Sequence, residues 1–543
     1  MEKLSKVKIV TYFFLFCYLL VGLIIFKDFG IGIEEHFQRK SGFYWLIKFL
    51  DYLGLEQLKD LSLIRYDEIK TNFKLPTVEN NLNYGVLFDL PLAFIEVVFN
   101  LEGANIFLIR HLVNFIFFFI SGIFFFKILS LRFDNELISL AGTLIYLLLP
   151  KSFGSSFFDG KDLFFLSIFT INCSLYLNFV LNRNLNNVIY FAVFSAFSVS
   201  SRVFGLVIPI SFLIIEVLRY VNNLEIKKLK YVLFFFIFFF LTLLIHWPFF
   251  GYLISDFSNY KNFFKVKVIL QVFFDNQFFN SQDLPFSYIP TLIFNSTPVY
   301  VLLFFSIGFI YQFRRIFLRI IDLKEQSFNN DLWKGKKEKF DIFLFINFLA
   351  ILTHYFIYNP NLFSGWRHYI FINLFLTYYS AYSFSIILKF YKTRYHPILF
   401  TIIFIFTIEL IYKLFIYHPY QTYYMNNVIS KDKKSYFEID NLSLSRYDAL
   451  NFILKDSPNK EKIYVANASW TPLEEGKFLL DKKDWNKFIF IGNENKEKAD
   501  YIYTNYFYEV DINYNDKYEI PSSFKIYNEL IIDDVKIYSI FKK

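Results

Sequence analysis

The chain has 543 residues, of which 55% are hydrophobic, and its formal net charge is +8. Apolar runs recur from residue 8 to residue 416, more than one soluble core can bury, so the composition excludes an ordinary soluble protein and predicts an integral membrane protein. The basic residues cluster beside hydrophobic segments, where membrane topology explains them, so the charge does not indicate a nucleic-acid partner. The two cysteines, Cys17 and Cys173, lie in apolar segments and predict neither a disulfide framework nor a metal cluster.

The apolar runs predict a mainly α-helical bundle with about eleven transmembrane helices. The first covers residues 8–26, and because no small-residue cleavage pattern follows it, we interpret it as an anchor rather than a signal peptide. The other ten are expected near residues 105–131, 136–150, 162–182, 188–201, 203–219, 231–250, 296–313, 341–358, 369–389 and 397–416. Two alternatives stay open for residues 188–219, a helical hairpin or one long helix, and the choice sets the sidedness of every later loop.

The long first loop, residues 27–104, contains two segments that predict helices lying on the membrane surface. Phe43, Leu46 and Leu50 recur at helical spacing, and residues 86–101 combine apolar patches with isolated acidic residues. Lys and Arg are retained in short cytoplasmic loops, and a hairpin turning at residues 200–202 places most of them on one side. This orientation predicts a cytoplasmic N-terminus, in a bacterial inner membrane, with the C-terminal region in the periplasm.

From residue 417 the composition shifts to Asn, Asp, Lys and Tyr, and no later segment is apolar enough to cross a bilayer. We therefore predict a transmembrane domain over residues 1–416 and a separate soluble α/β domain over residues 417–543. Runs of β-branched and aromatic residues predict strands at 462–465, 488–491, 501–504, 524–527 and 535–541, with the last two forming a hairpin and with a helix at 446–455.

Charged residues beside the predicted helices gather near the outer face. They are Glu34, Glu35, Arg110, His111, Asp159, Lys161, Asp162, Arg202, Arg367 and His368. A charge close to a bilayer is costly and indicates a function, although each one taken alone fits a side chain that reaches out to the interface equally well. Together they would suit transfer from a lipid phosphate, in which a carboxylate removes a proton from the acceptor and cations stabilise the departing phosphate.

The order of several short motifs resembles the GT-C glycosyltransferases, a superfamily that includes protein O-mannosyltransferases and the lipid A aminoarabinose transferase. The motifs are residues 32–39 (GIEEHFQR), 110–112 (RHL), 150–154 (PKSFG), 158–162 (FDGKD) and 365–368 (GWRH), and residues 423–427, 437–440 and 445–447 resemble the start of the outer domain of bacterial members. The resemblance implies a polyprenyl-phosphate sugar donor, a glycan, lipid or protein acceptor, and transfer at the outer face, usually with inversion.

The same resemblance implies roles for individual residues. Glu34 or Glu35 would be the catalytic base, and because the usual pair there is Asp followed by Glu, the longer Glu34 leaves open which carboxylate is productive. Asp159 and Asp162 match the second acidic motif, with two open roles: binding a divalent cation such as Mg²⁺ or Mn²⁺, or orienting the acceptor. The residues expected at the donor phosphate are Lys161, Arg202, Arg367 and His368, and those expected to support the first loop are Arg110 and His111.

Two other classes of function compete with a transferase. A transporter or flippase of a lipid-linked or envelope substrate also needs many helices and intramembrane polar groups, but it should place charges near the bilayer midplane. A scaffold whose C-terminal domain binds an envelope partner is the third hypothesis. The sequence contains no nucleotide-phosphate loop, so no nucleotide cofactor is expected, and the predicted partners are a lipid-linked sugar and membrane lipids.

Overall fold

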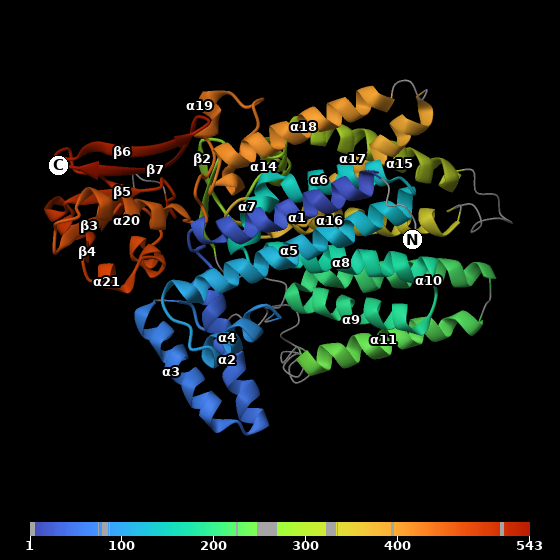
Figure 1. The fold of residues 1–543 in the computed structure, drawn as a ribbon, viewed down its shortest axis with the longest axis horizontal. Coiled ribbons are helices and arrows are strands. Elements are labelled where there is room, and N and C mark those ends of the chain that lie inside the picture. Colours follow the sequence, from blue (N-terminus) through green and yellow to red (C-terminus); the bar gives the residue numbers. More distant parts are fainter. Residues whose placement is uncertain are drawn as a thin grey trace.

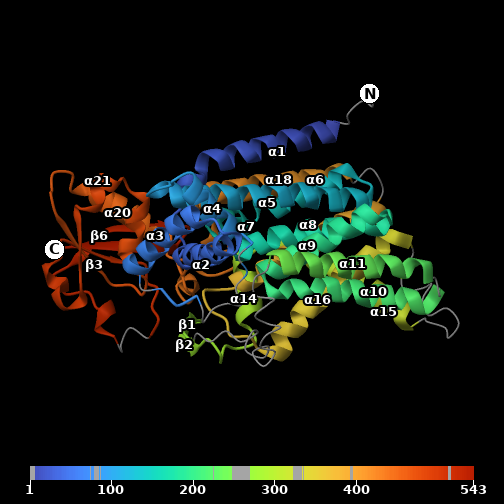
Figure 2. The same ribbon diagram turned by 90° about the horizontal axis from the view of Figure 1, so that it is seen from below.

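The computed structural model describes residues 6–73, 75–78, 85, 87–223, 226–246, 269–321, 333, 335–391, 396–510 and 515–543. A long helical body occupies most of the molecule, and a β-sheet region lies beyond one of its ends (Figure 1). The C-terminus lies in the sheet region, whereas α1 begins near the opposite end of the helical body (Figure 2). The fold is therefore mainly helical with a C-terminal mixed β-sheet, as the sequence predicts.

Six helices of the described chain are long and apolar enough to cross a membrane: α1 (Lys6–Ile25), α5 (Ala104–Phe133), α8 (Asp162–Leu181), α15 (Val299–Ile321), α16 (Gly335–Tyr358) and α18 (His396–Ile416). A seventh span is possible if α6 (Glu136–Leu148) and α7 (Pro150–Phe158) count together, although they are bent by 57°. The bend has a local cause, since Pro150 has no N–H to continue the first helix and Leu149 is held extended before it. These long apolar helices indicate an integral membrane protein.

Four further helices of the described chain belong to the bundle. They are α9 (Leu185–Ser201), α10 (Val207–Asn223), α11 (Ile226–His246) and α17 (Ile372–Phe390). α17 buries polar residues such as Asn373 and Thr377, which lowers its hydropathy without exposing it. The end of the expected crossing 231–250 lies outside the described residues, and the count of about eleven crossings stays a prediction.

The chain turns sharply between α9 and α10. Arg202 is extended, with φ −149° and ψ 137°, and the short helix η3 (Val203–Leu206) follows it. A Cβ atom at Gly205 would lie 2.4 Å from the carbonyl carbon of Ser198, so only glycine allows this close return. The predicted hairpin at residues 200–202 is confirmed, and the alternative of one long helix is wrong.

Three helices of the first loop lie at the end of the bundle nearest the sheet: α2 (Glu35–Leu53), α3 (Glu56–Asn72) and α4 (Asp89–Val98) (Figure 1). Phe43, Leu46 and Leu50 of α2 form a buried cluster with Ala93 of α4, which confirms the helical spacing seen in the sequence. α2 ends where Gly54 adopts a left-handed conformation with φ 69°.

The sheet region contains five strands in the order β4-β3-β5-β7-β6. Their bounds are β3 (Ile463–Asn467), β4 (Phe488–Ile491), β5 (Tyr501–Thr504), β6 (Lys525–Ile532) and β7 (Val535–Lys542). β3 runs parallel to β4 and β5, whereas β7 is antiparallel to β5 and β6. Asp533 and Asp534 join the last two strands with positive φ angles, as a two-residue hairpin turn requires. All five predicted strands are confirmed, as is the helix α20 (Ser445–Asp456).

Short helices and two further strands connect the longer elements. They are η1 (Phe26–Asp28), β1 (Gln271–Phe274), β2 (Gln277–Asn280), α14 (Tyr288–Ser296), η5 (Arg367–Tyr369), η7 (Gln421–Tyr423), α19 (Lys431–Lys434), η8 (Leu473–Leu479), α21 (Lys482–Trp485), η9 (Asn493–Lys498) and η11 (Asp516–Tyr518). β1 and β2 form an antiparallel hairpin that the sequence analysis did not predict.

Residues 417–446 pack onto the loop between α1 and α2. The N–H of Ile33 donates to the carbonyl oxygen of Leu442 at 3.0 Å, and Nη2 of Arg446 donates to the carbonyl oxygen of Ile31 at 2.9 Å. Gly30 approaches so closely that an added Cβ would lie 2.0 Å from the carbonyl oxygen of Leu444. The segment after α18 therefore holds the loop that carries Glu34 in a fixed position.

Candidate functional site

The ends of four helices and a short 3₁₀ turn meet at the end of the bundle nearest the sheet, and each contributes charged side chains. Glu34 precedes α2, Asp159 follows α7, Lys161 and Asp162 begin α8, Arg202 follows α9, and Arg367 lies in η5. These residues are as many as 333 positions apart in the chain, yet ion pairs join them. We call Glu34, Asp159, Lys161, Asp162, Arg202 and Arg367 the charged cluster.

Glu34 is the carboxylate of the charged cluster that retains access to solvent. It forms ion pairs with Nη2 of Arg367 and, at 3.5 Å, with Nζ of Lys161, and its side chain remains 25% exposed. Burial disfavours the ionised form, but the charges of Arg367 and Lys161 outweigh burial and hold the pKa of Glu34 well below its usual range. Glu34 is therefore ionised at neutral pH and placed beside two cations.

Glu35 follows directly in the chain but lies in a different environment. Its side chain is buried, and Oε1 accepts hydrogen bonds from the N–H of Gly32 at 2.7 Å and is 3.2 Å from Nε2 of His111. Successive residues of a helix point about 100° apart, so neighbouring glutamates reach different surroundings. The sequence did not distinguish the two carboxylates. In the structure Glu34 belongs to the charged cluster, whereas Glu35 contacts its own loop through Gly32 and α5 through His111.

The turn between α7 and α8 is organised by Asp159. Its Oδ1 accepts hydrogen bonds from the N–H of Asp162 at 2.8 Å and of Lys161 at 3.3 Å, which caps the start of α8. Its Oδ2 is buried and, among the described residues, has no hydrogen-bond partner. Burial raises the pKa of Asp159 to about 6, against the opposing charge of Arg367.

Asp162 joins the two arginines of the charged cluster. It is almost fully buried and forms ion pairs with Arg202 and, at 3.9 Å, with Nη1 of Arg367. A buried carboxylate needs such partners, because an unpaired charge in this position would be strongly unfavourable. Asp162 therefore fixes the guanidinium groups of Arg202 and Arg367 next to each other.

Arg110 lies in a second ion pair behind the charged cluster. Its Nη1 contacts Oδ1 of Asp89 at 2.8 Å, and both side chains are buried. Asp89 begins α4, so this ion pair ties α4 to α5, and Arg39 with Glu96 ties α4 to α2 in the same way at 2.5 Å. Arg110 and His111 thus contact the first loop, where the sequence analysis expected them to provide support.

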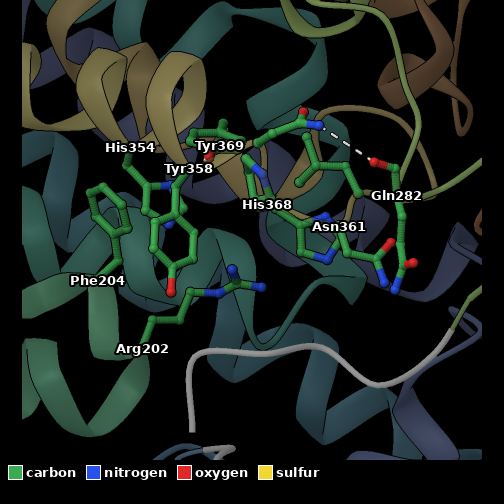
Figure 3. Close-up of a pocket in the computed structure, with 11 residues that line it drawn as sticks. Arg202, Phe204, Gln282, His354, Tyr358, Asn361, His368 and Tyr369 are labelled. Atoms are coloured by element: carbon green, nitrogen blue, oxygen red, sulfur yellow. Dashed lines mark hydrogen bonds between the residues drawn. The ribbon is translucent and has the colours of Figure 1, made fainter. Parts of the chain in front are cut away.

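A cavity of about 460 Å³ opens beside Arg202 and His368 (Figure 3). Its walls come from η3, the end of α16 and the segment after it, and the side chain of Arg202 points into it toward Tyr358 and Asn361 (Figure 3). Burial, aided by the charges of Arg367 and Arg202, lowers the pKa of His368 well below its usual range, so this imidazole is neutral at pH 7. The cavity thus presents a cation and a neutral imidazole beside the cluster.

Several residues of this cavity were missed or discounted in the sequence. His354 contacts the hydroxyl of Tyr369 at 2.8 Å through Nδ1, and it also lines the cavity. Asn361 and Gln282 contribute amides to the cavity, and Asp89, outside the cavity, partners Arg110. None of these residues stands in a charged motif, and only the folded chain brings them to the site.

Binding a divalent cation is one of the two roles expected for Asp159 and Asp162. Within the described ranges, no group of three or more His, Cys, Asp or Glu side chains is arranged to hold a metal ion. Glu34 and Asp162 already have arginine or lysine partners, which a cation would have to displace. Metal binding at this site therefore stays a prediction.

A separate network of charges lies at the opposite end of the bundle. Arg132 donates to both carboxylate oxygens of Asp341 at 2.6 Å, and Arg183 and Arg219 pair with Glu216. Each carboxylate accepts from at least two groups, so these ion pairs connect helices and offer matched controls for the charged cluster.

Comparison with protein-family models and with curated protein sequences finds no match for the chain.

Proposed function

We propose that this protein is a membrane glycosyltransferase that moves a sugar from a polyprenyl-phosphate donor to an acceptor at the end of the bundle nearest the sheet. The observation that carries the proposal is the convergence of carboxylates and arginines from distant parts of the chain beside one cavity. The resemblance of the motifs to the GT-C glycosyltransferases supports the same reaction class. In this proposal about eleven helices span a bacterial inner membrane, with the N-terminus cytoplasmic and the site periplasmic.

The donor phosphate would compete with Glu34 for its two cations. Arg367 and Lys161 now neutralise Glu34, and Arg202 faces the cavity beside them. A phosphate bound by these three side chains would release the Glu34 carboxylate, and its pKa would rise toward the ordinary value as its cations turn to the phosphate. Donor binding would thereby convert an ion-paired carboxylate into a usable base.

The released Glu34 would act as general base for the acceptor. It would take the proton of an acceptor hydroxyl while the hydroxyl oxygen bonds to the anomeric carbon of the sugar. The bond from that carbon to the phosphate oxygen breaks, and the leaving phosphate keeps the electron pair, stabilised by Arg202, Arg367 and Lys161. A single displacement of this kind inverts the anomeric centre. Asp159 lies in the turn between α7 and α8, beside Lys161, and its proposed role is to orient the acceptor.

Transfer from labelled polyprenyl-phosphate hexoses and pentoses tests the proposal in membranes that contain the full chain. We expect release of free polyprenyl phosphate with the wild type, and a loss of at least about 100-fold in Arg367→Gln, because removing one charge-stabilising group typically costs two to three powers of ten. The matched control is Arg183→Gln, since Arg219 still pairs with Glu216 there and the position lies about 30 Å away along α8.

Equal activity of Arg367→Gln and the wild type would contradict the proposal. Uptake of a lipid-linked substrate into vesicles, without any covalent product, would favour the alternative of a transporter or flippase.

A further inference from the structure

A second cavity, of about 490 Å³, lies between the β1–β2 hairpin and the sheet region. Its size falls within the range of ligand pockets, roughly 300 to 1,000 Å³. We call it the hairpin cleft. Its aromatic lining comes from three parts of the chain: Phe273, Phe278, Phe437, Tyr506, Phe507 and Tyr508. The motifs of the charged cluster include none of these side chains.

The aromatic rings of the hairpin cleft are partly open to solvent. Phe273 and Phe278 stand on neighbouring strands with ring centroids 5.0 Å apart, and both are half-buried. Tyr506 and Tyr508 are half-buried as well, while Phe437 and Phe507 are buried. Half-exposed aromatic rings form flat apolar surfaces, and the C–H face of a sugar ring packs on such surfaces.

The charged groups of the hairpin cleft already have partners. Nζ of Lys536 contacts Glu529 at 2.5 Å, Nζ of Lys434 donates to a carbonyl oxygen of the β6–β7 turn at 2.6 Å, and Asp534 contacts Lys431 at 3.0 Å. An ionic ligand would have to break these contacts. The cleft therefore suits a neutral ligand that accepts or donates hydrogen bonds through hydroxyl groups.

Glu438 provides a carboxylate on the floor of the hairpin cleft. Oε1 accepts from the N–H of Phe273 at 3.2 Å and Oε2 from Nδ2 of Asn441 at 3.5 Å, which leaves further lone pairs on both oxygens. Burial raises the pKa of Glu438 to about 7. A sugar hydroxyl within the cleft is a suitable donor to this group.

We propose that the hairpin cleft binds a neutral oligosaccharide, which is the acceptor or the growing end of the acceptor. The identification of this oligosaccharide as the acceptor rests on the proposed transferase function. The cleft is joined to the charged cluster by one short segment: Glu438 lies in its floor, and Leu442, four residues later, holds the loop of Glu34 through Ile33. A glycan seated in the cleft would therefore contact the segment that positions the proposed base.

Binding of neutral hexaoses tests the proposal with the full chain in lipid nanodiscs, because sugar-based detergents would compete. The probes are cellohexaose, maltohexaose, laminarihexaose and a mannohexaose, and saturation-transfer NMR and titration calorimetry report binding. We expect at least one hexaose to bind the wild type, with Kd raised at least tenfold in both Phe278→Ala and Tyr508→Ala. The control is Tyr464→Ala, which removes a 42% exposed ring of β3 that does not line the cleft.

Glu34→Gln separates this proposal from the transferase proposal. We expect that variant to bind the hexaose as the wild type does, whether or not it transfers sugar. Two outcomes would overturn the proposal: no binding of any hexaose to the wild type at 10 mM, or unchanged Kd in both cleft variants while their thermal unfolding matches the wild type.

Discussion

At the scale of single residues, the two adjacent glutamates have different environments and therefore different expected phenotypes. Glu34→Gln keeps the shape of the side chain but cannot take a proton, so we expect sugar transfer to fall at least about 100-fold, in line with the usual contribution of a general base. The lowered pKa of Glu34 means that its ionised form also stabilises the fold through Arg367 and Lys161, so we expect the thermal unfolding temperature to fall as well. Transfer assays and thermal unfolding of the purified variant measure both.

Glu35→Gln should affect stability without abolishing transfer. Glu35 is buried, accepts from Gly32 and contacts His111, and weakening a buried hydrogen-bonded group costs about 1–3 kcal/mol. We expect a lower unfolding temperature with residual transfer activity in the fraction that stays folded. A stable, inactive Glu35→Gln protein together with an active Glu34→Gln protein would reverse the two assignments.

Asp159 predicts a pH dependence of stability. Its pKa is raised from 3.8 to about 6, so between these values the folded state binds more protons than the unfolded state, and stability falls as pH rises through this window. Asn in its place keeps the acceptor for Lys161 and Asp162 but never ionises. We expect Asp159→Asn to exceed the wild type in stability at pH 7.5, by at most about 3 kcal/mol, and the difference to vanish near pH 4.

Thermal unfolding of both proteins from pH 4 to pH 8 measures this effect. If the stability advantage of Asp159→Asn over the wild type grew as pH fell, Arg367 would stabilise Asp159 as a carboxylate, contrary to the raised pKa.

At the scale of elements, the loop between α1 and α2 depends on a close backbone approach. A Cβ at Gly30 would lie 2.0 Å from the carbonyl oxygen of Leu444, so Gly30→Ala must displace either the loop or the segment after α18. Overpacking of this kind costs about 1–3 kcal/mol, and small displacements of a catalytic group lower rates strongly. We expect reduced transfer and a lower unfolding temperature.

Gly492→Ala is the matched control, because no atom lies within 4 Å of an added Cβ there and its φ is −67°. Equal activity and stability in the two glycine variants would mean that the loop of Glu34 does not need this docking.

The sequence predicted the long helices and the strands because each follows from a local pattern. α5 and α8 are long, mainly apolar runs, and β4 and β5 coincide with the expected aromatic and β-branched runs. The bend at Pro150 and the helix α7 were not predicted. Residues 151–156 are mainly polar and predict a loop, yet most of them are buried in α7. The β1–β2 hairpin was missed as well, although its pairing is local and Asp275 and Asn276 form a two-residue turn between two aromatic runs.

The members of the candidate site could be named from the sequence, but their pairing could not. Charge and position near helix ends identify Glu34, Lys161 and Arg367. Which carboxylate meets which arginine depends on helix rotation and tertiary packing, so the difference between Glu34 and Glu35 and the partnership of Arg110 with Asp89 needed the structure.

At the scale of the whole molecule, the charged cluster and the sheet region share one end of the bundle, and the turn after α5 lies at the other (Figure 2). We expect opposite labelling by a membrane-impermeant thiol reagent in a background with Cys17→Ser. A cysteine at the exposed Glu494 should react in cells with a permeable outer membrane, whereas one at the exposed Asp134 should react only after the inner membrane is opened.

Labelling of both positions from the same side would contradict the orientation, and with it the placement of the site in the periplasm.

The most direct test of the central claim is a cryo-EM map of the protein in lipid nanodiscs with bound polyprenyl phosphate. We predict phosphate density within hydrogen-bonding distance of Arg367 and Lys161, with the carboxylate of Glu34 moved away from both and an isoprenoid chain leading into the bilayer. Phosphate density at the opposite end of the bundle, beside Arg132 or Arg183, would contradict the account. An unchanged pairing of Glu34 with Arg367 at saturating ligand would contradict it equally.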